Sequence, residues 1–138
     1  MNEYAEALRG ACRAACAEIM DAVQAEAELL SSGTATPAQL RADDHPYAQR
    51  HGYVQPPYSP TVINEQTSTF RTSWGQEPVA EYPDGFRGAV VNTDPKSAWL
   101  EFGTNRMLGR PLPLEVLTNT EARAAEIMQQ HIDQALNR

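Results

Sequence analysis

Four side chains between positions 43 and 51 are of the types that bind metal ions: Asp43, Asp44, His45 and His51. Carboxylates and imidazoles are common ligands of zinc. Their spacing matches no common zinc template, however, and Pro46 breaks any helix that would align the two imidazoles. A small metal-dependent hydrolase that uses this cluster is one alternative function. The simpler interpretation is that the histidines hydrogen-bond the backbone of an irregular loop.

Cys12 and Cys16 are the other residues with reactive side chains. Four positions apart on a helix, they share a face but are poorly oriented to form a disulfide with each other. A catalytic thiolate needs a basic neighbourhood and a partner histidine, whereas Arg9 and Arg13 are expected to face solvent. We therefore predict that both cysteines are small buried hydrophobic residues, and that the protein occupies a reducing compartment.

The sequence carries no other signature of catalysis. It contains no Gly-x-Ser-x-Gly elbow, no Gly-x-x-x-x-Gly-Lys loop and no Gly-x-Gly-x-x-Gly fingerprint. We therefore expect no enzymatic activity and no cofactor. The net charge is −7, and residues 1–30 carry six acids against two arginines. A nucleic-acid-binding module, the second alternative, is disfavoured because it needs clustered lysines and arginines.

Residues 94–111 contain the strongest local signals in the chain. Asp94 is expected to cap a short helix that has Pro95 at its first position, and Gly103 to end it in the left-handed conformation. Trp99 and Phe102, three positions apart, share a face of this helix. We expect at least one of them to be a core residue on the sheet, and the alternative is that they anchor a subunit contact.

Glu101 lies between these two aromatic residues and shortly before Arg106 and Arg110. One interpretation is a solvated acid on an exposed helix face. In the other, Glu101 pairs with an arginine and fixes the loop at residues 103–110, because a carboxylate–guanidinium pair can be bidentate. Both interpretations stay open, and Thr104 belongs to the same candidate contact.

Residues 3–30 are predicted to form one long helix, about 40 Å at 1.5 Å per residue. Apolar side chains recur along it at spacings of three and four, which is typical of one buried stripe. The stripe consists of Tyr4, Leu8, Cys12, Ala15, Ile19, Val23, Ala27 and Leu30. So long a helix in a small domain makes part of the stripe a candidate contact with a neighbour.

Residues 34–67 hold five prolines, which exclude a long helix or a central strand. The same segment contains Tyr47, Tyr53 and Tyr58, and aromatic residues are uncommon in disordered segments. We interpret it as an arm that becomes ordered against another subunit, with these tyrosines at the contact.

The second half of the chain is predicted to contain a small antiparallel sheet and two helices. Strands are expected at residues 69–74 and 86–92, with a turn at residues 83–85 and an additional short strand at 79–82. The last helix is expected at residues 113–137. The prediction is one α+β domain. No signal peptide or apolar run of about 20 residues occurs, so a soluble, cytoplasmically made protein is expected.

The residues from Val91 to Thr104 resemble the head–tail joining proteins of long-tailed DNA phages, also called neck, connector or tail-completion proteins. That family has an aromatic-x-Glu-Phe-Gly-Thr core, then a basic residue and Met, then Arg-Pro before a final helix, and an upstream Arg-x-Ser-Trp strand. The matching positions here are Trp99, Glu101-Phe102-Gly103-Thr104, Arg106-Met107, Arg110-Pro111 and Arg71-Thr72-Ser73-Trp74. Pro111-Leu112-Pro113 departs from the usual Pro-Phe-Leu.

The resemblance implies a structural protein of the virion neck, made in the cytoplasm of a bacterial host. It implies a homo-oligomeric ring, commonly of six subunits and with twelve as the other possibility. Its implied partners are portal, adaptor or stopper proteins on the head side and terminator or tube proteins on the tail side. Genomic DNA would pass through the lumen without specific binding, which suits an acidic chain because like charges repel. No membrane contact is implied.

Overall fold

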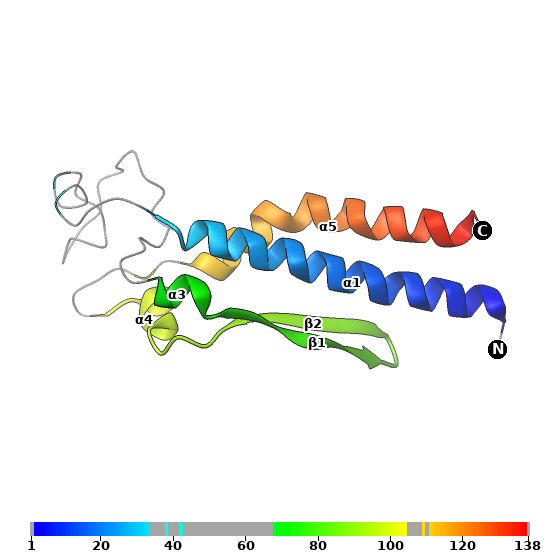
Figure 1. The fold of residues 1–138 in the computed structure, drawn as a ribbon, viewed down its shortest axis with the longest axis horizontal. Coiled ribbons are helices and arrows are strands. Elements are labelled where there is room, and N and C mark those ends of the chain that lie inside the picture. Colours follow the sequence, from blue (N-terminus) through cyan, green and yellow to red (C-terminus); the bar gives the residue numbers. More distant parts are fainter. Residues whose placement is uncertain are drawn as a thin grey trace.

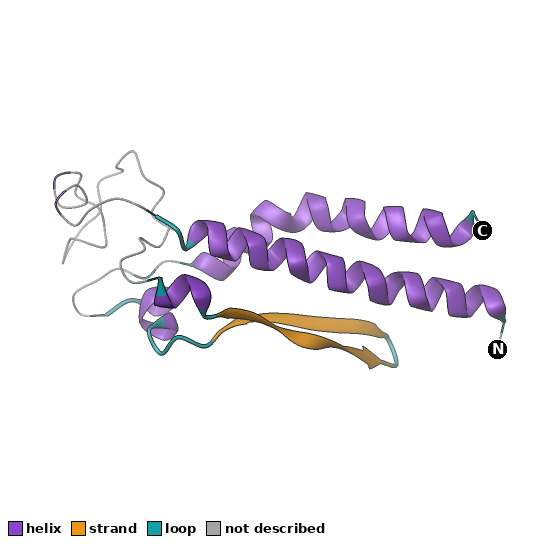
Figure 2. Ribbon diagram, viewed as in Figure 1, coloured by secondary structure: helices purple, strands orange, loops and turns teal. Residues whose placement is uncertain are grey.

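The computed structural model describes residues 2–33, 38, 42, 68–104, 109 and 111–137. Its elements are α1 (Glu3–Leu30), α3 (Thr69–Thr72), β1 (Trp74–Tyr82), β2 (Gly85–Asn92), α4 (Ser97–Phe102) and α5 (Leu112–Leu136). In Figure 1, α1 forms the middle layer, with α5 along one side and the two strands along the other. Figure 2 shows helix and sheet in the mixed arrangement that the sequence predicts. The predicted arm, with its tyrosines, lies outside the described residues apart from Ala38 and Ala42.

Helix α1 has the bounds that the apolar spacing predicts. The Asn2 side chain accepts a hydrogen bond from the backbone N–H of Tyr4 at 3.2 Å, which satisfies one of the free donors of the first turn. At the other end, Ser31 Oγ donates to the carbonyl of Ala27 and accepts from the Trp74 indole at 2.9 Å. This buried serine therefore joins the end of α1 to the start of β1.

Strands β1 and β2 form an antiparallel hairpin around the predicted turn at Pro83 and Asp84. The turn closes with Tyr82 opposite Gly85, whose φ of 146° favours glycine. The short strand predicted at residues 79–82 is the last part of β1. Strand β1 lies at the edge of this two-stranded sheet, and its register shifts beside Pro78, which is where a proline is tolerated in a strand.

The strand predicted at residues 69–74 is wrong, because most of that segment is helix α3 and β1 begins only at Trp74. Thr72 Oγ1 donates to the carbonyl of Ser68 at 3.0 Å, and Ser73 Oγ donates to that of Thr69 at 2.6 Å. These hydroxyl groups satisfy backbone acceptors locally, which competes with pairing in a sheet.

Helix α5 runs antiparallel to α1 and starts one residue before its predicted first position. Asn119 donates to Glu26 at 2.7 Å near one end of the pair, and His131 contacts Glu18 at 2.8 Å towards the other. Pro113 lies in the first turn of the helix, where its missing N–H costs no intrahelical bond.

The hydrophobic core of the described residues is small. Its buried apolar side chains are Ala15, Met20, Ala27, Leu112, Val116 and Ile127. Of the eight apolar residues that define the predicted stripe on α1, only Ala15 and Ala27 are buried, and Tyr4 is exposed. Most of the stripe is therefore only partly covered by the sheet and by α5.

Candidate assembly surface

The turn before α4 is built by side chains that bond nearby backbone groups. Asp94 Oδ1 accepts a hydrogen bond from the N–H of Lys96 at 2.8 Å, and Asn92 Oδ1 accepts from the N–H of Asp94 at 2.9 Å. The helix itself begins at Ser97, so Asp94 closes the turn that leads into α4 and Pro95 lies in that turn. The prediction that Asp94 caps the helix with Pro95 at its first position is wrong, because Lys96 occupies the cap position and no side chain caps the helix.

Asp94 is buried, and its second carboxylate oxygen has no hydrogen-bond partner among the described residues. We expect Asp94→Ala to lower the free energy of unfolding by about 1 kcal/mol, because the turn loses its acceptor for the Lys96 N–H. Asp94→Asn keeps that acceptor and removes a buried negative charge, so its loss should be clearly smaller. Urea denaturation of both variants measures the difference. Equal losses would show that the acceptor does not matter.

The exposure of Trp99 and Phe102 corrects the expectation that at least one of them belongs to the core. Trp99 is 59% exposed and Phe102 is 83% exposed. Leu100, between them in sequence, is the α4 side chain that packs on the core around Ala27 and Val116. A helix of six residues presents one face inward, and here Leu100 occupies it. Trp99 and Phe102, hereafter the α4 aromatic pair, are left on the surface.

The end of α4 has the predicted glycine. The N–H of Gly103 donates to the carbonyl of Trp99 at 2.9 Å, and φ at Gly103 is 79°, in the range that favours glycine; its ψ of −178° is extended rather than left-handed helical. Gly109 then returns to this point. A Cβ at Gly109 would lie 2.6 Å from the carbonyl oxygen of Glu101. Only a glycine can lie so close to the end of the helix.

Glu101 is half-buried and Thr104 is exposed. Arg106 and Arg110 lie outside the described residues, so pairing of Glu101 with either stays a prediction. The four residues of the alternative metal site, Asp43, Asp44, His45 and His51, also lie outside them. In the part of the chain that is described, no group of histidine, cysteine and acidic side chains is arranged to hold a metal ion.

An apolar groove of about 730 Å³ runs between the sheet and α5, with α1 at its base. Side chains from α1 that line it include Leu8, Cys12, Cys16, Ile19 and Val23. Strand β2 contributes Phe86, Gly88 and Val90, and α5 contributes Val116, Leu117 and Met128. We call this surface the α1 groove. The groove was not predicted from the sequence. The length of the apolar stripe on α1 did indicate that part of the stripe could face a neighbour.

The two cysteines are free thiols that line the α1 groove and are half-buried. The prediction that they are small buried hydrophobic residues is therefore only partly met, because each side chain is partly exposed. Their side of α1 lies over the gap between the sheet and α5, which neither element fills. The accessibility of both thiols to reagents therefore depends on whether the groove is occupied.

Two arginines lie beside the groove, near the turn of the hairpin. Arg9 pairs with Glu81 at 2.7 Å. Arg13 lies over the ring of Phe86, with its guanidinium carbon 6.0 Å from the ring centre. Both side chains are largely exposed, as predicted. Among the described residues Arg13 has no carboxylate partner, which leaves one cation next to an apolar surface.

No helix in the described ranges combines the length and apolar character needed to cross a membrane. No protein-family model matches the chain, nor does any curated protein or solved structure.

Proposed function

We propose that the protein is a structural subunit of the neck of a long-tailed DNA phage, which assembles into a ring between the head and the tail. One observation carries the assembly role. Few apolar side chains are buried within the described part of the chain, while the α4 aromatic pair and the α1 groove are open to solvent. Contiguous exposed apolar surface of this kind is typical of protein–protein contacts.

The composition of these surfaces supports assembly with protein. Aromatic residues are enriched among the side chains that dominate binding energy, particularly where they enter a pocket on the partner. Trp99 and Phe102 are such side chains, and they flank Glu101 on a single short helix. The groove provides an apolar surface on the same chain. A protein with both surfaces is suited to contacts with further copies or with neighbouring virion proteins.

The neck role rests on the resemblance of residues 68–136 to head–tail joining proteins. The order hairpin, short helix and long helix accords with that resemblance, and Trp99, Glu101 and Gly103 of its core motif lie on or next to α4. The net charge of −7 suits a ring through which DNA passes without being retained. Head-side portal or adaptor proteins and tail-side terminator or tube proteins are the proposed partners.

The test is electron microscopy of particles produced with and without the protein. Loss of the protein is expected to give DNA-filled heads and separate tails, and the wild-type gene supplied in trans should restore joined virions. Glu101→Ala should fold normally but fail to restore joining, because it alters the α4 surface. Glu121→Ala, an exposed acid on α5, is the matched control and should restore it. Complete virions without the protein would refute the neck role, and full complementation by Glu101→Ala would show that this acid is merely solvated.

A further inference from the structure

We propose that α4 of one copy docks into the α1 groove of a second copy, with Glu101 placed against the second copy's Arg13. The contact rests on the proposed ring assembly and specifies which surfaces form it. Trp99 and Phe102 would supply the apolar part of the contact, and Glu101 with Arg13 the charged part. The occupant of the groove is thus a second copy of this chain.

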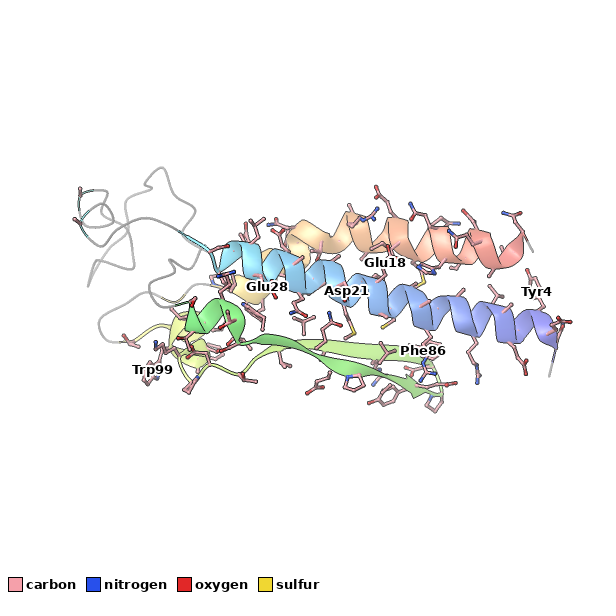
Figure 3. All side chains as sticks on the ribbon, in the orientation of Figure 1. Tyr4, Glu18, Asp21, Glu28, Phe86 and Trp99 are labelled. Carbon is pink, nitrogen blue, oxygen red and sulfur yellow. The ribbon has the colours of Figure 1, made fainter. Side chains whose placement is uncertain are left out.

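The pair of Glu101 and Arg13 has to form between copies, because these two residues lie far apart in one molecule. Figure 3 shows Trp99 at the end where α1 finishes, and Phe86 on the hairpin, next to the first half of α1. Arg13 contacts Phe86. From Arg13 to Leu30 the helix advances about 26 Å at 1.5 Å per residue. Glu101 therefore cannot reach Arg13 within one chain.

The apolar surfaces match in kind. The α4 aromatic pair projects from a short helix, whereas the groove is a concave surface of about 730 Å³ lined largely by aliphatic and sulfur-containing side chains. A buried aromatic side chain removes about 150–250 Å² from water. Trp99 is 59% exposed and Phe102 83% exposed in the single chain, so the pair can supply part of the roughly 800 Å² that each partner contributes to a stable interface.

The charges also match. Arg13 lies over Phe86 beside the groove, and Glu101 lies on α4 next to Phe102, about 100° from it around the helix axis. Within the described ranges neither side chain has an ion-pair partner of its own, whereas Arg9 is already paired with Glu81. A carboxylate–guanidinium pair that forms next to buried aromatic rings adds direction to an otherwise apolar contact.

The symmetry of this contact agrees with a ring. The α4 aromatic pair and the α1 groove are different surfaces of the same chain. Each copy therefore presents the aromatic pair to one neighbour and the groove to the other. Such head-to-tail contacts close into rings when the rotation between neighbours permits, and otherwise form filaments.

A charge exchange tests the contact directly. Glu101→Arg and Arg13→Glu are each expected to weaken self-association of the purified protein at least tenfold, because like charges would then face each other. An equimolar mixture of the two variants should recover self-association to within about threefold of wild type, since every contact in an alternating assembly pairs opposite charges. Sedimentation velocity and mass photometry measure both effects. Glu121→Arg, which makes the same change of net charge on α5, is the control and should assemble like wild type.

The thiols of Cys12 and Cys16 give a second readout. Their alkylation by iodoacetamide should slow when wild-type protein is concentrated enough to assemble, and should stay fast in Phe102→Ala at the same concentration. Tyr82→Ala removes an exposed aromatic residue at the hairpin turn instead and should keep the wild-type protection. Unchanged circular dichroism of the variants would establish that they are folded.

Each of the following outcomes would overturn the proposed contact between copies. Wild-type protein that stays monomeric at about 100 μM, where a contact with micromolar Kd is nearly saturated, excludes the contact, while particle morphology still decides the neck role. Variants that assemble like wild type, or fail to recover on mixing, place the ring contact elsewhere. Unchanged alkylation of both cysteines in an assembled protein excludes the groove as the docking surface.

Discussion

Replacing Ile127 with alanine is expected to lower the free energy of unfolding by about 2–5 kcal/mol, the usual range for truncating a fully buried aliphatic side chain. Ile127 is 1% exposed and is one of the two largest fully buried side chains described. It lies one turn from both Arg123 and His131, which contact Glu18 of α1, so it belongs to the same face of α5. The truncation leaves a cavity between the two long helices.

Leu136→Ala is the matched control for this prediction. Leu136 lies on the same helix but is 43% exposed, so its truncation should cost clearly less than that of Ile127, about 1 kcal/mol or less. Urea denaturation followed by circular dichroism measures both variants. A similar loss for the two substitutions would show that the contact between α1 and α5 does not govern stability. A large loss for Ile127→Ala alone would establish that this contact supports one wall of the α1 groove.

Replacing Gly88 with alanine is expected to lower the free energy of unfolding by about 1–3 kcal/mol, as overpacking of a tight contact does. A Cβ at Gly88 would overlap the sulfur of Met20, which is buried on α1. The methionine would have to leave its position, or β2 would have to move away from α1. Because both residues line the α1 groove, the substitution should also weaken self-association.

Two further variants test whether the overlap with Met20 causes the loss of stability in Gly88→Ala. Gly75→Ala adds the same methyl group to β1, where nothing lies within 4 Å of it, and should leave stability nearly unchanged. Gly88→Ala in a Met20→Ala background should cost clearly less than in wild type, since the overlapping sulfur is gone; the difference is the coupling energy of the pair. Equal costs in both backgrounds would assign the effect to the backbone of β2 rather than to Met20.

The parts of the fold that could be predicted from sequence depend on local signals. The bounds of α1 follow from the apolar spacing, and the hairpin turn from Pro83, Asp84 and Gly85. The end of α4 follows from Gly103, because few other residues adopt its positive φ. The segment at residues 69–74 was misread, since its alternation of side chains is shared by a short helix whose hydroxyl groups bond its own carbonyls.

The candidate site could be predicted only in part. Sequence spacing places Trp99 and Phe102 on one face of a helix, but the same spacing suits a face turned towards the core or towards solvent. Tertiary structure decided this, because Leu100 is the side chain that reaches the core. The sequence likewise placed Cys12 and Cys16 on the apolar side of α1 without showing that this side borders an open groove.

The sequence by itself therefore determined the two long helices, the turn of the hairpin and the end of α4, but not helix α3. Tertiary structure alone decided that α1 packs against both α5 and the hairpin, and that a groove remains between α5 and the hairpin. The reason is that the positions of α5 and the hairpin around α1 depend on contacts such as Gly88 with Met20 and His131 with Glu18. These partners are more than sixty positions apart in the chain, so no local pattern of residues reveals that they meet.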